Sequence, residues 1–489
     1  MKIIFCAWSL FLLSILSLLS GCGSDSASSP VPAPVASNAL SADNINLVFV
    51  VTPDLVNNAS GDINPDTANL TSQGLQRSLQ MATYLKQQVL GSRNATRIYS
   101  LQPMSHLQTT NNYPDMAAIE YIQQFAMLNQ VSLTGAGGYN SPLYTANSFP
   151  LNTSYADPSV GNQAVPFQGL EYAATSNNNA ILLSTLLYFN LPGFYVFTAP
   201  WETINGLMAT VKKQYTDLTL PTAYAGPNQV YAVSIKPKTA TTASSASLVT
   251  FSSNLNPPAS YPVLPASLAS AACPNQTSTP ALFNISAAAL PAMGINTSMT
   301  IHMIRHAEAH PWSGWDDGNY VAAGQWRALG LPGALKGKIN PTMVYSIDPA
   351  QVTLGTLSIA GNSNFSYVRP SLTVAPYAIA NNLPFNLVSS FQLFDPTSPD
   401  ATVQYFFYDS RFSGKTILLA WEHDHFPPII TALLAKYPSP SVKSAPAWPS
   451  ADYDTIWTVK LDAQGNLTVD NSLCEGIDSS KLPATAPLF

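Results

Sequence analysis

The stretch Thr300-Ile-His-Met-Ile-Arg-His-Ala-Glu308 decides how this chain folds. Its apolar run is typical of a β-strand, and Arg305 and His306 follow directly after it. The next periodic segment, Val321-Ala-Ala-Gly-Gln-Trp-Arg-Ala-Leu329, has the spacing of a helix. A strand followed by a helix predicts an α/β domain, in which ligands bind beyond the carboxyl ends of parallel strands. The residues that end each apolar run are therefore the candidates for a functional site.

Blocks of the second half of the chain have counterparts, in the same order, in the first half. This order predicts a tandem duplication into α/β domains at 45–290 and 291–489, each a mostly parallel sheet between helices. The matched blocks begin at Asn46 and Thr300, Leu70 and Val321, Ile98 and Val344, Phe194 and Ile417, and Gln229 and Thr455.

The composition excludes several classes of protein. The 489 residues include 20 Lys and Arg against 26 Asp and Glu, a net charge of -6. Charged residues make up 9% of the chain, against about 25% in an average soluble domain. A charge-rich disordered chain is therefore excluded. Without a basic stripe to neutralise phosphates, nucleic acid is not an expected partner.

The first residues have the features of a targeting segment. Lys2 precedes an apolar stretch from Ile3 to Leu19, which is followed by Ser20, Gly21 and Cys22. This pattern resembles a bacterial lipoprotein signal with its lipobox. The resemblance implies a signal peptide at 1–21, a lipid on Cys22 and an outer-membrane lipoprotein that faces the periplasm or the cell surface. An ordinary signal peptide with an incidental cysteine is the alternative.

The residues after Cys22 lack periodicity, and we interpret 22–44 as a flexible tether. Once the signal is removed, Cys273 and Cys474 are the remaining thiols. In an oxidising compartment they form one bridge or stay as two separate buried cysteines, and the sequence leaves both interpretations open.

Five of the six histidines lie in the second copy. An imidazole suits attack on phosphorus because its unperturbed pKa, about 6.5, leaves a ring nitrogen free near neutral pH. A phosphoryl group also needs several fixed donors, which planar guanidinium groups supply. His306 has Arg305 beside it, and Arg369 is available from a later element.

These blocks resemble the histidine phosphatase superfamily, which has a phosphoglycerate mutase-like fold. The resemblance rests on Arg305-His-Ala-Glu308, where the family has Arg-His-Gly, on Tyr367-Val-Arg-Pro-Ser-Leu-Thr373, and on Trp421-Glu-His423. It implies a metal-independent phosphomonoester hydrolase that uses no cofactor. His306 would be the nucleophile that forms a phosphohistidine. Arg305, Arg369 and His423 would bind the phosphoryl oxygens.

The leaving alkoxide needs a proton from a carboxyl group that its surroundings keep neutral. The resemblance favours Asp424 for this role, with Glu308 as the rival and Asp395 as a third choice.

The first copy has Val51, Thr52, His106 and Thr203 where the second has Arg305, His306, Arg369 and His423. We therefore expect the first copy to be an inactive partner. Two other functions remain open. In the first, the whole protein is a non-catalytic binding or scaffold lipoprotein. In the second, the protein is a metal-dependent hydrolase whose metal is held by His302, His306 and His310, which are spaced four residues apart.

Overall fold

The computed structural model describes most of the compact unit Asn38–Phe489. The described residues are 40–57, 61–108, 112–132, 145–147, 151–152, 169–173, 175–268, 273, 281–286, 295–309, 318–349, 352–354, 364–388, 399–437 and 444–489. Cys22, His310 and Asp395 lie outside them, so the expectations for these residues have no structural counterpart. No helix in the described ranges is long and apolar enough to cross a membrane.

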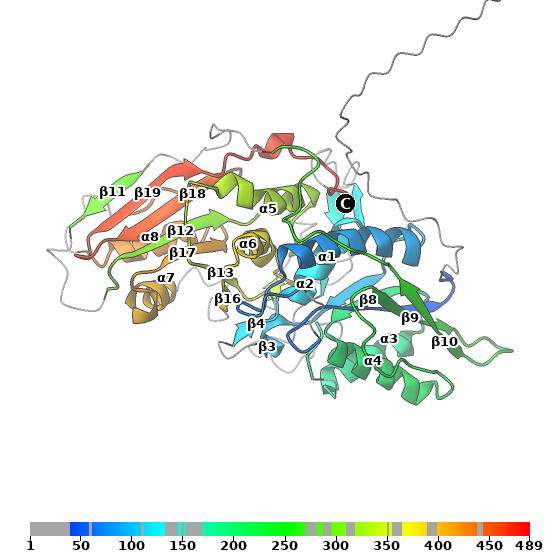
Figure 1. Ribbon diagram of the computed structural model, residues 1–489. Helices are drawn as coiled ribbons and strands as arrows, with labels where there is room; N and C mark the ends of the chain where they lie inside the picture. The colour runs from blue at the N-terminus through cyan, green and yellow to red at the C-terminus, as the bar shows by residue number, and fades with distance from the viewer. Residues whose placement is uncertain are drawn as a thin grey trace, which may run out of the picture. The chain divides into compact units, whose positions relative to one another are not determined.

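The first sheet contains a parallel group of strands with β1 at its inner edge. Two antiparallel strands extend the sheet on the other side of β1. In order across the sheet (Figure 1), the strands are β10 (Ser245–Ser252), β9 (Gln229–Lys236), β1 (Ile45–Val51), β8 (Gly193–Ala199), β2 (Arg97–Ser100) and β7 (Leu151–Asn152).

The second sheet has the same plan. Its parallel group begins with β12, and antiparallel strands follow on the other side of β12. In order (Figure 1), the strands are β11 (Leu282–Ile285), β19 (Leu467–Cys474), β18 (Thr455–Leu461), β12 (Met299–Arg305), β17 (Thr416–Trp421), β13 (Met343–Ile347) and β16 (Phe385–Val388). The predicted α/β class is confirmed, with sheets that mix parallel and antiparallel strands.

Helices cover both faces of each sheet. On β1, Leu47 and Phe49 pack toward α3 and α4, whereas Val48 and Val50 pack toward α1 and α2. This alternation is the period of two that a strand buried on both faces requires. The helices of this half are α1 (Ser72–Tyr84), α2 (Ala117–Met127), α3 (Asn177–Phe189) and α4 (Trp201–Gln214). We call this half lobe 1.

The half built on the second sheet, lobe 2, repeats this arrangement. Ile304 packs with α5 and α6, whereas Ile301 and Met303 pack with α7 and α8. The helices are α5 (Ala322–Leu335), α6 (Arg369–Ala380), α7 (Pro399–Val403) and α8 (Phe426–Leu434). The short strands outside the two sheets are β3 (Leu107–Gln108), β4 (Tyr113–Pro114), β5 (Gln130–Ser132), β6 (Thr145–Asn147), β14 (Val352–Leu354) and β15 (Asn364–Ser366). Single helical turns are η1 (Leu85–Val89), η2 (Pro103–Ser105), η6 (Gln404–Tyr408), η7 (Ser410–Phe412) and η8 (Ser479–Lys481).

The two lobes share one apolar core. It combines side chains of α1 and α2 with Leu329 of α5 and Leu372 of α6. The buried amides of Gln123 and Asn319 exchange hydrogen bonds across it, at 2.9 and 3.0 Å. Residues on both sides of the predicted boundary at 290/291 are therefore packed as one unit. In addition, β11 precedes that boundary but pairs with β19 in the second sheet.

The start of the ordered region corrects the predicted tether. Leu40 is buried, and its carbonyl oxygen accepts a hydrogen bond from the Arg93 guanidinium at 2.5 Å. The Asn46 amide donates to the carbonyl oxygen of Ser41 at 2.8 Å. Residues 40–44 therefore belong to the folded unit, and the prediction of a tether up to residue 44 is wrong at this end.

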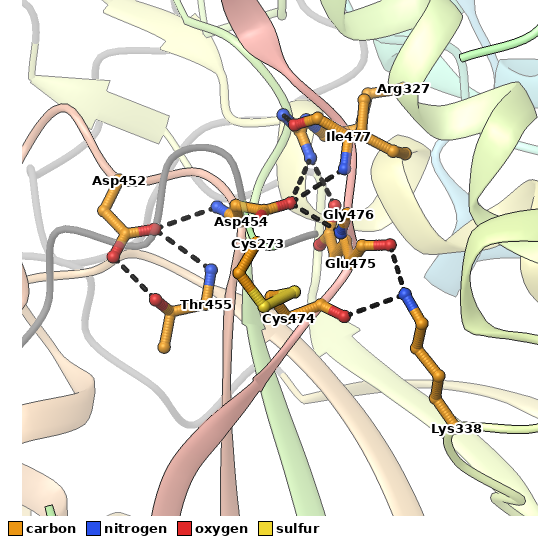
Figure 2. The surroundings of a disulfide bond; sticks show 10 residues. All are labelled: Cys273, Arg327, Lys338, Asp452, Asp454, Thr455, Cys474, Glu475, Gly476 and Ile477. Atoms are coloured by element: carbon orange, nitrogen blue, oxygen red, sulfur yellow. Dashed lines mark hydrogen bonds and ion pairs between the residues drawn. A yellow bond between two sulfur atoms is a disulfide. The ribbon is translucent and has the colours of Figure 1, made fainter. Parts of the chain in front are cut away.

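A disulfide joins Cys273 to Cys474, with 5.7 Å between the Cα atoms. Of the two interpretations that the sequence left open, the bridge is the one in the structure. Cys474 ends β19, and the residues directly after it, Glu475 and Ile477, bind the guanidinium of Arg327 (Figure 2). The disulfide therefore lies beside a buried network of charges.

Arg327 is the cation at the centre of this network. Its guanidinium contacts the carboxylates of Glu308 at 2.7 Å and Asp454 at 4.0 Å, and it also bonds to Glu475. All four side chains are fully buried. Burial, together with the charge of Asp454, raises the pKa of Glu475 to about 8, although Arg327 acts in the opposite direction. One guanidinium thus serves three acidic groups.

Removal of this cation should strongly destabilise lobe 2. We expect Arg327→Met to lower the free energy of unfolding by at least about 3 kcal/mol, because buried carboxylates lose their counter-charge. Urea unfolding followed by circular dichroism measures this change. Arg411→Met is the matched control, since the side chain of Arg411 is 62% exposed in its pair with Asp409 and should cost less than about 1 kcal/mol. Equal stabilities of the two variants would contradict the assigned role of Arg327.

Candidate active site

Two neighbouring parallel strands of lobe 2 end side by side. The register pairs Arg305, the last residue of β12, with Trp421, the last residue of β17. The backbone N–H of His306 continues this ladder by donating to the carbonyl oxygen of Trp421 at 2.9 Å. His306 and His423 therefore follow adjacent strand ends, at the edge of the sheet where α/β proteins bind ligands.

The ring of His306 is held in one orientation. Its Nδ1 lies 2.7 Å from the carbonyl oxygen of Ala307, so Nδ1 carries the proton and the Nε2 lone pair remains available. The backbone N–H of Ala307 donates to the hydroxyl of Thr373 on α6 at 2.8 Å, and that hydroxyl donates to the Arg369 carbonyl. The first turns of α6 thus fix the loop that carries His306.

The surroundings of His306 favour the neutral ring. Burial lowers the pKa of His306 well below its ordinary value, and the positive charges of Arg369 and Arg305 lower it further. The charge of Glu422 opposes this shift but does not reverse it. A neutral, oriented imidazole between two guanidinium groups is the form in which a histidine can attack an anionic phosphorus centre.

The two arginines approach His306 from different elements. The Arg305 guanidinium lies 3.8 Å from the ring centre of Tyr453 and donates to the carbonyl oxygens of Ser450 and Asp452. Arg369 is the first residue of α6, and its guanidinium lies 4.8 Å from the ring centre of Tyr367. Aromatic rings beneath both guanidinium planes restrict their orientation. Both arginines lie close enough to His306 for their charges to lower its pKa.

His423 is the second histidine at these strand ends. Its Nε2 lies 3.1 Å from a carboxylate oxygen of Asp424. Its Nδ1 is buried and has no hydrogen-bond partner in the described part of the chain. Burial lowers the pKa of His423, with a further contribution from the charge of Arg305. The contribution of Arg305 indicates that His423 and the predicted phosphoryl ligands face a common region.

Glu422 is a site residue that the sequence analysis did not select. Its carboxylate accepts a hydrogen bond from the Tyr367 hydroxyl and lies 3.4 Å from Nδ1 of His425. Burial alone would raise the pKa of Glu422, but the nearby His425 ring, the charge of Arg369 and the hydrogen bond from Tyr367 lower it to about 2. Glu422 is therefore ionised at neutral pH and positions Tyr367 and His425. The Trp-Glu-His motif contained this residue, yet only the contacts reveal its role.

The structure corrects the assignment of Glu308. Its carboxylate accepts hydrogen bonds from the Arg327 guanidinium and from the Ser479 hydroxyl, both at 2.8 Å. A carboxylate that neutralises a buried arginine is not available to donate a proton to a leaving group. Glu308 is therefore a structural residue of lobe 2.

Asp424 does not have the surroundings expected of a neutral carboxylic acid. Its side chain is 74% exposed, and within the described residues it forms an ion pair with His423. Asp424 therefore lies beside the cluster, exposed to solvent rather than buried.

The described residues also do not bring histidines together as metal ligands. Nδ1 of His302 lies 3.1 Å from the Thr458 hydroxyl on β18, and burial lowers the pKa of His302 to about 4. Within the described ranges, one group of acidic, histidine or thiol side chains is close enough for a metal ion, namely Cys273, Asp454 and Cys474. The two cysteines of that group form the disulfide.

Lobe 1 has different residues at the corresponding strand ends. The Thr52 backbone N–H donates to the Ala199 carbonyl oxygen at 3.0 Å, the same contact that His306 makes with Trp421 in lobe 2. The register pairs Val51 with Ala199, which places Trp201 rather than Thr203 at the position of His423. The helix that corresponds to α6 is α2, and it begins at Ala117, so the predicted match of His106 to Arg369 is also wrong.

No protein-family profile matches this chain, and no curated protein sequence matches it. Among solved structures, a putative phosphohistidine phosphatase SixA from Agrobacterium tumefaciens matches with 14% identity, covers 33% of this chain and 91% of its own, and has a TM-score of 0.20. A phosphoserine phosphatase from Entamoeba histolytica in complex with phosphoserine has 14% identity, coverage of 35% and 96%, and a TM-score of 0.22. A putative phosphohistidine phosphatase SixA from Nakamurella multipartitia has 14% identity, coverage of 40% and 94%, and a TM-score of 0.22.

The charges around His306 predict its titration. We expect no inflection of the His306 ring resonances near pH 6.5, the approximate value at which an unperturbed histidine titrates. Replacement of Arg369 by Met removes a positive charge, so the pKa of His306 should rise. Histidine-selective NMR titration measures both, with Arg411→Met as a control that leaves His306 unchanged. An ordinary titration of His306 in the unmodified protein would contradict the described electrostatics.

Proposed function

We propose that lobe 2 is a metal-independent phosphomonoester hydrolase that acts through a phosphohistidine on His306. The observation that carries the proposal is the orientation of the His306 ring. The Ala307 carbonyl holds Nδ1, burial and two arginines keep the ring neutral, and Nε2 is left as the nucleophile. The arrangement also agrees with the resemblance of the Arg-His, Tyr-Val-Arg and Trp-Glu-His blocks to the histidine phosphatase superfamily.

In the first step, Nε2 of His306 attacks phosphorus and the bond from phosphorus to the ester oxygen breaks. The leaving alkoxide takes a proton and departs as an alcohol. Arg305, Arg369 and His423 bind the three non-bridging oxygens, where charge is spread in the transition state. In the second step, a water molecule attacks phosphorus and gives a proton to the Asp424 carboxylate that the first step left, the bond to nitrogen breaks, and phosphate leaves with His306 restored.

Asp424 is the proton donor in this proposal. Its carboxyl group lies 3.1 Å from Nε2 of His423, so a proton on this carboxyl group would be delivered beside the proposed phosphoryl site. Glu422 cannot take this role because its pKa is lowered to about 2. Substitution of Asp424 by Asn should therefore slow hydrolysis of alkyl phosphates more than that of esters with acidic leaving groups.

Lobe 1 is the inactive copy of a tandem duplication in this proposal. The strand orders from β10 to β7 and from β19 to β16 correspond one to one, which supports the duplication. The absence of an imidazole at Thr52 supports the loss of the histidine chemistry in this lobe.

We also propose that the protein is an outer-membrane lipoprotein with its lipid on Cys22. The apolar segment before Cys22 and the polar residues after it support this location. Cys22→Ser should shift the protein from the detergent phase to the aqueous phase in a phase-partition assay. Retention of this variant in the detergent phase would contradict the anchor.

A phosphatase assay tests the enzymatic proposal. We expect the full chain to hydrolyse an aryl phosphate with and without EDTA. His306→Ala should lower kcat by at least about 10³-fold, because the nucleophile is lost. His302→Asn is the matched control on the same strand and should retain activity, since His302 contacts Thr458 and not the proposed phosphoryl site.

Two outcomes would contradict the proposal. Full activity of His306→Ala would show that another group attacks phosphorus. Loss of activity with EDTA, restored by a divalent metal, would favour the metal-dependent hydrolase that the histidine spacing left open.

A further inference from the structure

Lobe 1 has a cluster of ionisable side chains at the end of its sheet that corresponds to the active site of lobe 2. Asp54 follows β1, Glu202 lies in the first turn of α4, and Asp115 directly precedes α2. In lobe 2 the same end of the sheet carries arginines and histidines. The two lobes therefore present opposite charges on the same framework.

The charges of these three carboxylates all affect the same side chain, that of Tyr172. Burial raises the pKa of Tyr172 to about 12, and the charges of Glu202, Asp54 and Asp115 all contribute to the rise. Asn57 bridges two of them, since its backbone N–H donates to Asp54 Oδ1 at 2.5 Å and its side-chain amide donates to Glu202 Oε1 at 2.7 Å. Asp54 and Glu202 thus lie on either side of Asn57, beside Tyr172.

Asp54 lacks the counter-charge that its equivalent in lobe 2 has. Asp54 and Glu308 each follow the central strand by the same interval, and Arg77 and Arg327 occupy equivalent places in α1 and α5. Arg327 neutralises Glu308, whereas Arg77 pairs with Asp62 at 2.6 Å. Burial, followed by the charges of Glu202 and Asp115, raises the pKa of Asp54 to about 6 despite a backbone hydrogen bond from Asn57.

Three oxygen atoms of this cluster have no hydrogen-bond partner within the described residues. They are the Thr52 hydroxyl, Oδ2 of Asp54 and Oε2 of Glu202, and all three atoms are buried. Thr52 and Asp54 are 0% exposed as whole residues. Buried acceptors without hydrogen-bond donors are uncommon in folded proteins. Three of them in one cluster are therefore candidates to accept hydrogen bonds from a bound ligand.

The segments that build this end of lobe 1 are poor in basic residues. No lysine or arginine occurs between Arg97, the first residue of β2, and Lys212, in the last turn of α4. The nearest basic group, His106, is already held by Asp115 at 2.7 Å and stacks on the Tyr172 ring at 3.7 Å. Among the described residues, no lysine or arginine forms an ion pair with Asp54 or Glu202, so a cationic ligand would meet no competing counter-charge there.

We propose that lobe 1 binds a ligand through a primary ammonium group, held by the Thr52 hydroxyl and the carboxylates of Asp54 and Glu202. An ammonium has three N–H donors, which match the three unpartnered acceptors. The ligand site is independent of the phosphatase site, since no residue is shared.

Calorimetric titration of the full chain with n-butylammonium chloride, at constant ionic strength, tests this proposal. We expect binding to the unmodified protein, and at least about tenfold weaker binding to Asp54→Asn and to Glu202→Gln, because each loses a charge-assisted hydrogen bond. Thr52→Val removes one acceptor without a change in shape and should also weaken binding. Asp217→Asn is the matched control, since Asp217 is an exposed acid of the same lobe, and it should bind unchanged.

Tetramethylammonium chloride has the same charge but no N–H donor, so it should bind at least about tenfold more weakly than n-butylammonium. Equal binding of the two cations would overturn the three-acceptor site. Absence of n-butylammonium binding, unchanged binding to all three site variants, or displacement of n-butylammonium by calcium or magnesium ions would also overturn it. Aryl phosphate hydrolysis should be unchanged in Asp54→Asn, which separates this test from that of the phosphatase.

Discussion

The ion pair between Arg327 and Glu308 fixes the loop on which the proposed chemistry of this protein depends. Glu308 lies two residues after His306, and Arg327 lies in α5, which packs on the same sheet. The same guanidinium binds Glu475 directly after the disulfide-bonded Cys474. A buried pair of this kind adds little net stability compared with apolar packing, but it strongly penalises any conformation in which either partner is left alone. The pair therefore specifies one path for the chain after β12.

The two lobes show how one framework accepts opposite chemistry. In lobe 2 the strand ends carry Arg305 and His306, and in lobe 1 they carry Val51 and Thr52. The strand order and the two buried faces of each sheet are independent of these residues, because they depend on apolar side chains along the strands. Loss of the cationic cluster from lobe 1 is thus compatible with an intact core, and α1 and α2 of that lobe still pack against α5 and α6.

The sequence predicted the strands and the principal histidines because these features are local. The apolar run before Arg305 predicted β12, and the position of His306 at its end predicted a place at the ligand-binding edge. Relations between distant segments were not predictable in the same way. The Trp-Glu pair at 201 begins a helix, whereas the pair at 421 spans the end of a strand. Alignment of these two pairs by sequence therefore assigned the wrong residue of lobe 1 as the equivalent of His423. The partner of Glu308 and the role of Glu422 likewise depend on contacts between residues far apart in the chain.

Identification of the phosphorylated residue tests the central claim most directly. The full chain is mixed briefly with a radiolabelled phosphomonoester, quenched in alkali and mapped by mass spectrometry, because a phosphorus–nitrogen bond survives alkali and is hydrolysed in acid. The account predicts an acid-labile phosphoryl group on Nε2 of His306, the nitrogen that the Ala307 carbonyl leaves free. A phosphoryl group on another residue, or turnover of substrate with no phosphorylated intermediate in a rapid quench, would contradict it.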